Sequence, residues 1–264
     1  MPGDVFLILA EFGRQSEQAA LDLLIPTVER VFPGAALHTI VVDGAATAAA
    51  DHEIAPHIQY IQADNSLGEF SGWDRGIDRV ERRFALRSDS VFVLANDTVV
   101  RADKRSRVRD VPSDRAASAA SGALVGWVDE YPRSVELFGW TLRQWVDTSF
   151  VISNRNTLES LRPLGRAMPD SDVFADDWRA FFRHPSPLSV NYREYLSTYF
   201  FGEQPSAEFP HSWYAQQPLT AANADAFKAK LRCVFCEHLL GARARSARIP
   251  LVDIRETPLP VDPF

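Results

Sequence analysis

The sequence predicts an α/β protein, with a mostly parallel sheet flanked by helices and a helical C-terminal part. Apolar runs at 4–10 and 35–42 have the length and composition of buried strands. Between them, at 15–32, apolar residues recur at helical spacing. Polar residues follow each apolar run directly. Strand, helix and strand in this order are typical of the βαβ units that build parallel sheets.

Length, charge and composition fit one large domain. The 264 residues suffice for a single domain over 1–264, which we divide into halves at 1–121 and 122–264. The net charge of −7 argues against a nucleic-acid binder. The longest apolar runs are too short to cross a bilayer, and we find no signal peptide or transmembrane segment. Two cysteines fit a reducing compartment, so we expect a cytoplasmic protein.

The elements of the first half follow from short apolar runs. We expect Pro26 to bend or divide the first helix, because proline removes a backbone donor. Further strands are expected at 58–62 and 90–95, with an amphipathic helix between them. These runs complete a second strand–helix–strand unit.

Three glycines mark that second helix. Gly68, Gly72 and Gly76 are spaced four apart and would lie along one helical face. Two compatible interpretations stay open: close packing of the helix on the sheet, and close approach of a ligand. The spacing does not match the G-x-G-x-x-G of dinucleotide-binding folds.

The second half opens with a charged segment at 101–121, which we interpret as a solvated or mobile loop, with a fold over a ligand as the alternative. Two strands, whose bounds are given below, are expected next. A helix with Asn156 or Thr157 as its cap would follow. The remaining predictions are strands at 123–128 and 136–152 and helices at 156–161, 173–182, 192–201 and 222–240, with Gly241 ending the last.

Two motifs in the first half carry a family resemblance. The stretch NSLGEFSGWDRGI at 65–77, followed by VFVLANDTVV at 91–100, resembles the sugar-nucleotide-binding half of GT-A glycosyltransferases. It is similar to family-2-like enzymes and their rhamnan-synthesis relatives. The resemblance covers 4–98, is patchier to 155 and is weak beyond 202. It implies a GT-A-like fold and an inverting transfer of sugar from a nucleoside-diphosphate donor to a glycan or lipid-linked glycan acceptor, as in polysaccharide biosynthesis.

The resemblance places the donor at the carboxyl ends of the strands, where ligands collect in open α/β sheets. In the family, an Asp in a V-D-D-G-S-like turn accepts hydrogen bonds from the nucleotide base. Asp43 in VVDGAAT is similar to it, with a turn-capping role as the alternative. Glu11 and Phe12 close the first strand on the same edge and are further donor-binding candidates.

Asp97 stands where the family has the last carboxylate of a D-x-D-like motif. There the carboxylate binds a divalent cation, Mn²⁺ or Mg²⁺, that offsets the charge of the leaving diphosphate. In this chain Ala95 replaces the first acid and Asn96 intervenes. A metal at Asp97 therefore stays open, as does a turn formed by Asn96 and Asp97. Without a metal, cations such as Arg75, Arg101 or Lys104 would have to meet the phosphates.

Two residue pairs complete the predicted substrate contacts. Asp74 and Arg75 lie in GWDRG, at a helix start, where amides and a guanidinium could meet phosphate. A solvated helix residue is the alternative for Arg75. Asp147 in WVDTSF stands where the relatives have acceptor-side residues, and Trp145 offers a stacking platform for a sugar, although core packing is commoner for tryptophan.

An inverting enzyme of this class needs a general base beside the acceptor. The relatives have an acidic residue late in the domain, in a segment like E-x-x-L-S-x-x-L. REYLSTYF matches it and indicates Glu194 as the catalytic base. Asp176 and Asp177 in FADDW are rivals, and a surface carboxylate is the alternative for all three.

Other readings of the chain stay open or are disfavoured. The incomplete acid motif keeps a catalytically inactive nucleotide-sugar or glycan-binding module open. A nucleotidyltransferase would have a Gly- and Arg/Lys-rich loop after the first strand, which EFGRQSE at 11–17 matches poorly.

Cys233 and Cys236 are interpreted as core cysteines, because zinc needs four ligands. The basic run at 241–248 is interpreted as solvated surface, with peripheral contact at the inner face of a membrane as the alternative.

Overall fold

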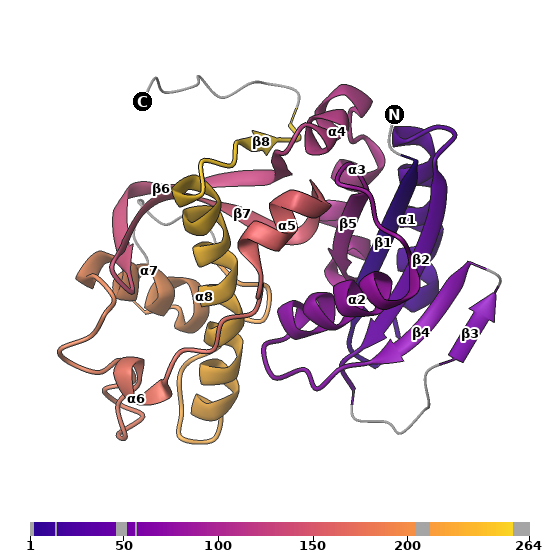
Figure 1. The fold of residues 1–264 in the computed structure, drawn as a ribbon. Helices are drawn as coiled ribbons and strands as arrows, with labels where there is room; N and C mark the ends of the chain where they lie inside the picture. The colour runs from indigo at the N-terminus through magenta and orange to yellow at the C-terminus, as the bar shows by residue number, and fades with distance from the viewer. Residues whose placement is uncertain (1–2, 14, 46–51, 56, 204–211, 256–264) are drawn as a thin grey trace.

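A single sheet runs through the described part of the chain. The computed structural model describes residues 3–13, 15–45, 52–55, 57–203 and 212–255, and within them the sheet has eight strands in the order β3-β4-β2-β1-β5-β7-β6-β8 (Figure 1). The strands are β1 (Asp4–Glu11), β2 (Ala36–Asp43), β3 (His52–Ala55), β4 (Ile58–Gln62), β5 (Val91–Asn96), β6 (Leu124–Leu137), β7 (Trp140–Asn154) and β8 (Leu251–Asp253).

Helices cover both faces of this sheet (Figure 1). They are α1 (Glu17–Val31), α2 (Glu69–Arg83), the 3₁₀ helix η1 (Asp97–Val100), α3 (Ala102–Arg109), α4 (Ser113–Ala120), α5 (Arg155–Leu161), α6 (Asp170–Val173), α7 (Val190–Phe201) and α8 (Ala224–Ser246). The predicted class is confirmed: an α/β fold with a mostly parallel sheet between helices and a helical C-terminal part. None of the helices in the described residues has the length and apolar character to span a bilayer.

The parallel strands bring the predicted polar residues to one edge. β1 pairs in parallel with β2 and β5, and β2 pairs in parallel with β4. In this register Glu11 lies opposite Asp43, and Ala10 lies opposite Asn96. The carboxyl ends of three adjacent strands therefore present neighbouring polar groups, as the sequence predicts.

Alternation along β1 divides the core between the two faces. Val5, Leu7 and Leu9 belong to the apolar cluster that holds α1, α3 and α4. Phe6 and Ile8 belong to the cluster that holds α2, α5 and α8. Because both faces are covered, β1 is apolar throughout instead of alternating with polar residues.

Two of the three spaced glycines hold α2 close to the sheet. A Cβ at Gly76 would lie 2.5 Å from Ile8 Cγ2, and one at Gly72 would lie 3.1 Å from Ala10 Cβ. Gly68 caps the helix with a φ of +57°, and a Cβ there would lie 2.7 Å from the Cys233 sulfur. The packing interpretation therefore holds for Gly72 and Gly76, while Gly68 lets α2 approach α8.

The hairpin β6–β7 is longer than the strands predicted at 123–128 and 136–152. β7 pairs antiparallel with β5 near its end and with β6 along most of its length. The far ends of the hairpin pack with α6, α7 and α8 in a third apolar cluster, which includes Tyr131, Leu142 and Tyr192. The hairpin and these three helices lie beside the parallel strands (Figure 1).

The loop predicted at 101–121 is wrong, because the segment forms α3 and α4. Val108 and Ala119 are fully buried in the cluster that also holds α1. The side chain of Arg30 on α1 donates to the carbonyl oxygen of Val111 at 2.9 Å. Because few apolar residues of α3 and α4 are buried, the charge-rich sequence has no helical apolar periodicity that would predict these helices.

The division of the first helix at Pro26 and the end of the last helix at Gly241 are also wrong predictions. α1 is continuous through Pro26, and α8 runs through Gly241 to Ser246. A glycine in a helix interior costs about 1 kcal/mol relative to alanine. Buried residues on both sides of Gly241, among them Leu240 and Ala242, offset that loss by packing.

The helix predicted at 173–182 is wrong as well. α6 ends at Val173, and Phe174 then forms an isolated antiparallel bridge with Phe182. The cap predicted at Asn156 or Thr157 belongs instead to Asn154, whose side chain accepts a hydrogen bond from the Thr157 amide at 2.9 Å.

Candidate active site

Asp43 organises the loops that follow β1 and β2. It is 1% exposed. Its Oδ1 accepts hydrogen bonds from the backbone amides of Gly13 at 3.1 Å and Ala45 at 2.7 Å. Its Oδ2 accepts one from the Tyr60 hydroxyl at 2.5 Å. The predicted turn-capping role of Asp43 is therefore present, and its contact with a nucleotide base stays a prediction.

Glu11 is a buried carboxyl group among other acids. Neither of its side-chain oxygens accepts a hydrogen bond from an N–H or O–H of the described residues. Burial raises the pKa of Glu11 to about 8, with contributions from the neighbouring carboxyl of Glu17 and from repulsion by Asp43 and Asp97. Because burial and the neighbouring negative charges disfavour its ionised form, Glu11 carries a proton near neutral pH.

Asn96 fixes the turn at the end of β5. Its Oδ1 accepts hydrogen bonds from the amide of Thr98 at 3.0 Å and from its hydroxyl at 2.5 Å. Its Nδ2 donates to the carbonyl oxygen of Thr148 on β7 at 3.3 Å. Asn96 is thus the cap of η1 and also joins β5 to β7.

Asp97 follows at the start of η1 and is partly buried. Burial raises its pKa, and repulsion by Glu69 acts in the same direction. A hydrogen bond from the Phe12 amide and attraction by Lys230 oppose the rise. Phe12 therefore contacts the site through its backbone, while its ring is exposed.

Thr148 links three segments at this point. Its amide donates to Glu237 Oε1 on α8 at 3.4 Å, and its hydroxyl donates to Glu69 Oε1 at the start of α2 at 3.1 Å. Its carbonyl oxygen accepts from Asn96. One residue of β7 thus holds two carboxyl groups beside the end of β5.

Asp147 precedes Thr148 and forms an ion pair. Lys104 Nζ on α3 lies 3.0 Å from Asp147 Oδ2. The amide and hydroxyl of Ser149 donate to Asp147 Oδ1 at 2.8 and 2.5 Å. Burial opposes ionisation, but Lys104 and these hydrogen bonds together hold the pKa of Asp147 below its usual value.

The pKa of Glu237 shifts in the direction opposite to that of Asp147. Burial raises its pKa to about 8, repulsion by Asp147 and Glu69 adds to the rise, and Lys230 and Lys104 oppose it. Lys230 lies two helical turns before Glu237 on α8, so both side chains share one helix face. Burial acts to lower the pKa of Lys230, but nearby negative charges raise it above its usual value, and Glu69 makes the largest of these contributions.

These residues form what we call the charged cluster. It combines acids with raised and lowered pKa values and two ammonium groups at the carboxyl edge of the sheet. Its members are Glu69, Asp97, Lys104, Asp147, Thr148, Lys230 and Glu237.

The structure brings several predicted residues to this region. Asp97 and Asp147 belong to the charged cluster, and Asn96 is bonded to it through Thr148. Glu11 and Asp43 border it, because the carboxylates of Asp43 and Asp97 both raise the pKa of Glu11.

Asp74 and Arg75 lie elsewhere. Asp74 accepts hydrogen bonds from the amides of Leu164 and Gly165, both at 3.0 Å, and therefore anchors the segment after α5. Arg162 Nε lies 3.5 Å from the same carboxylate. In the described residues no hydrogen bond or ion pair joins Asp74 to the charged cluster, and its donor-binding role stays a prediction.

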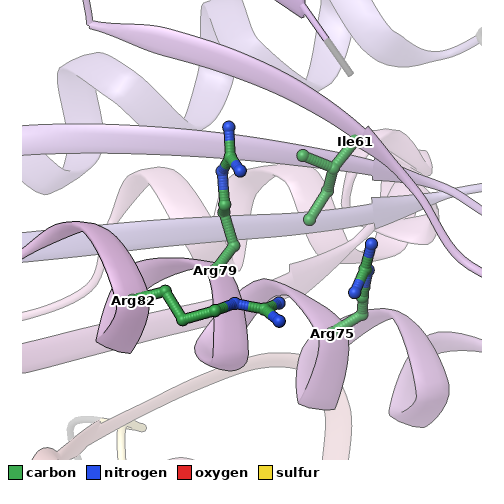
Figure 2. Close-up of a pocket in the computed structure, with 4 residues that line it drawn as sticks. All are labelled: Ile61, Arg75, Arg79 and Arg82. Atoms are coloured by element: carbon green, nitrogen blue, oxygen red, sulfur yellow. The ribbon is translucent and has the colours of Figure 1, made fainter. Parts of the chain in front are cut away.

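Arg75 lines a cavity of about 250 Å³ on the side of α2 that faces β4. The other residues lining it are Ile61 on β4 and, on the same helix face as Arg75, Arg79 and Arg82 (Figure 2). Arg79 donates to Gln59 Oε1 at 3.2 Å. Arg75 thus belongs to a basic face of α2, and its contact with donor phosphate stays a prediction.

Trp145 rests on a buried aromatic group. Its ring centroid lies 4.4 Å from that of Tyr131 and 5.1 Å from that of His238. The Tyr131 hydroxyl and His238 Nδ1 are 2.7 Å apart. Trp145 is partly exposed and lies two residues before Asp147, on the same face of β7, so it borders the charged cluster.

The predicted bases lie on the surface. Glu194 is exposed on α7. Asp177 is exposed in the turn between α6 and α7, where it accepts a hydrogen bond from the Arg179 amide at 3.0 Å. In the described part of the chain, neither forms a hydrogen bond or ion pair with the charged cluster. Their catalytic roles stay predictions.

Sequence reasoning missed Glu69, Thr148, Lys230 and Glu237. Glu69 is a first-turn acid inside the quoted glycine motif, and Thr148 adjoins Asp147, so both had a local signal. Lys230 and Glu237 lie on a helix far along the chain, and only their shared face distinguishes them.

The side chains of this site do not form a set of ligands suited to a divalent cation. Across the residues that the structure describes, no three His, Cys, Asp or Glu side chains gather as metal ligands. Lys230 and Lys104 instead lie among the acids. Cys236 is buried as predicted, whereas Cys233 is only partly buried beside Gly68; both thiols are free.

Comparison with known proteins shows no family. No protein-family model matches the chain, and no curated protein matches it. A solved structure described as "Crystal structure of 4-diphosphocytidyl-2C-methyl-D-erythritol synthase" matches with 12% identity and a TM-score of 0.36, over 65% of this chain and 82% of that one. At that score the match transfers no residue role to this chain.

Proposed function

We propose that this protein is a glycosyltransferase that moves a sugar from a nucleoside diphosphate to a glycan acceptor, with inversion at the transferred carbon. The observation that supports it is the charged cluster at the carboxyl edge of the sheet. There the strand ends of the first half, which resemble the donor-binding motifs of GT-A enzymes, meet β7 and α8 of the second half. Open α/β sheets bind ligands at this edge.

In this proposal the first half binds the donor. Asp43, Glu11 and the Phe12 backbone form the edge where the base would lie. Lys104 and Lys230 supply positive charge to the diphosphate as it leaves, in place of the divalent cation that a D-x-D-like motif would hold. The charges of Asp97 and Lys230 attract each other.

The acceptor lies on the side of β7 in this proposal. Trp145 provides an aromatic face near Asp147, and amphipathic rings of this kind pack well against sugars. Cell-surface polysaccharide and lipid-linked glycans are the acceptor classes that the resemblance implies. Glu194 is the proton acceptor that the same resemblance predicts.

Ligand-induced stabilisation tests the donor site. We would measure the Tm with UDP, GDP, CMP and dTDP, each with and without Mn²⁺ or Mg²⁺. At about 100 times Kd, binding adds about 2.7 kcal/mol. For a chain of this size the Tm should then rise by about 5 °C. We expect one nucleotide to give this rise without added metal.

Lys230→Met should weaken that nucleotide by about tenfold or more, because a charge-assisted hydrogen bond contributes about 1.5–3 kcal/mol. Lys228→Met is the matched control, since Lys228 pairs with the exposed Asp225 on the same helix. Absence of a Tm shift with every nucleotide would contradict the donor site. A shift without release of nucleoside diphosphate from the sugar donor would identify a binding module instead.

A further inference from the structure

We propose that Glu237 on α8 is the general base that takes the proton from the acceptor hydroxyl during sugar transfer. This inference rests on the proposed glycosyl transfer and assigns the base of the same site. It competes directly with Glu194, the residue that the sequence motif indicates.

Position is the first argument. The Glu237 carboxyl is held by the Thr148 amide at 3.4 Å, and the carbonyl oxygen of Thr148 accepts from Asn96 at 3.3 Å. The chain of contacts therefore leads from Glu237 to the Asn96–Asp97 end of β5, where the donor diphosphate is proposed to lie. Glu194, by contrast, lies on the outer surface of α7.

Access is the second argument. Residues on the core side of α8, such as Leu231 and Phe235, are fully buried. Lys230, Cys233 and Glu237 recur at spacings of three and four on another face and are only partly buried. Glu237 as a residue is thus only partly buried, on a helix face other than that of the core residues, as a base that must reach a substrate requires.

The charged groups that act on Glu237 lie on four elements, β7, α2, α3 and α8. Like charges on β7 and α2 favour the protonated form, while ammonium groups on α3 and α8 favour the carboxylate. With burial, they set the pKa of Glu237 at about 8, close to neutral, where a general base is most effective. The groups are Asp147, Glu69, Lys104 and Lys230, with the hydroxyls of Tyr131, Tyr192, Tyr195 and Tyr199 nearby.

The step balances with these groups. The acceptor O–H bond breaks, and its proton moves to a Glu237 carboxylate oxygen. The acceptor oxygen forms a bond with the anomeric carbon from the side opposite the diphosphate. The bond between that carbon and the phosphate oxygen breaks, and its electron pair leaves with the nucleoside diphosphate beside Lys104 and Lys230.

The test compares Glu237→Gln with the wild-type protein. Glutamine keeps the size of the side chain and cannot accept the proton, so kcat should fall by about 10²–10⁴-fold. The donor Kd from the nucleotide titration should change little. The wild-type rate should rise with pH to a plateau above about 8, and this rise should be absent in the variant. Glu237→Asp should restore part of the rate, and Glu159→Gln, an exposed glutamate on α5, is the control.

A second variant does not depend on the folding of Glu237→Gln. Glu69→Gln removes a negative charge that raises the pKa of Glu237, so the pH at half-maximal rate should fall by roughly half to one unit. An unchanged midpoint would contradict the assignment.

The possible outcomes distinguish a failure of the Glu237 assignment from a failure of the proposed glycosyl transfer. No release of nucleoside diphosphate by the wild-type protein with any sugar donor would overturn glycosyl transfer itself. A normal rate and pH profile in Glu237→Gln would overturn only the assignment of Glu237. Loss of the pH-dependent rise in Glu194→Gln, with the rise retained in Glu237→Gln, would transfer the role to Glu194.

Discussion

At the scale of single residues, the site is dominated by carboxyl groups that burial makes hard to ionise. Glu11 and Glu237 both have a pKa of about 8, and burial is the largest cause in each case. Asp147 shows the opposite shift, because Lys104 and Ser149 stabilise its charge. Acids of one type thus have different protonation states near neutral pH, which is the pattern expected where proton transfer occurs.

Glu11 should make the stability of the protein depend on pH. A carboxyl whose folded-state pKa is raised stabilises the fold fully below its unfolded pKa, about 4.3, and loses that contribution as pH rises through about 8. The free energy of unfolding should therefore fall across this window. Glu11→Gln should be more stable than wild type at pH 8 by on the order of 1–2 kcal/mol, with the gain vanishing toward pH 4.

Urea unfolding at several pH values between 4 and 9 would measure this difference. Glu29→Gln, an exposed position on α1, is the control and should leave the pH dependence unchanged. An equal effect of both substitutions at every pH would show that the burial of Glu11 is not the cause.

At the scale of elements, α2 connects the fold to the site. Its glycine face packs on β1, and Glu69 in its first turn reaches the charged cluster. On another side, Arg162 pairs with Asp74, Asp78 and Glu81, which fixes the helix to the segment after α5. A shift of α2 would therefore move Glu69 relative to Thr148.

Two helical glycines should respond oppositely to alanine. A Cβ at Gly76 would lie 2.5 Å from Ile8 Cγ2, so Gly76→Ala should destabilise the fold by about 1–3 kcal/mol. At Gly241 the nearest atom would be Trp145 Cα at 3.5 Å, an ordinary contact. Gly241→Ala should be neutral or stabilise by up to about 1 kcal/mol, because alanine favours helix.

Denaturant unfolding of both variants gives the comparison. Gly241→Ala is the matched control, since it tests alanine in a helix interior without the clash. Equal free energies of unfolding for the two variants would contradict the close packing of α2 on β1.

At the scale of the whole molecule, the charged cluster joins the two halves of the chain. Asp97 and Lys104 come from the first half, and Thr148 and Glu237 come from the second. The parallel strands thus supply one side of the site, and the hairpin and α8 supply the other (Figure 1). A ligand at this place would contact both.

Hydrogen exchange should show this joint response. Binding of the nucleoside diphosphate identified by the Tm screen should slow exchange at both 97–104 and 145–149, because ordering of the site suppresses local opening. α6, at Asp170–Val173, is the internal control and should not change. Protection confined to 97–104 would place the ligand on the first half alone.

The sequence by itself determined the parallel strands and the polar groups at their ends. Apolar runs and the residues that follow them are local features, so Asp43, Asn96 and Asp97 could be placed at one edge before the register was known. Helices that few apolar residues anchor, such as α3, gave no comparable periodic signal.

Only the tertiary structure decided what faces that edge. Glu237 and Lys230 come from α8, and Thr148 comes from β7, which pairs antiparallel with β5. Their role depends on contacts between segments far apart in the chain, and burial sets their charges. The pKa of a carboxyl group follows from the groups around it after folding, and no residue spacing encodes that environment.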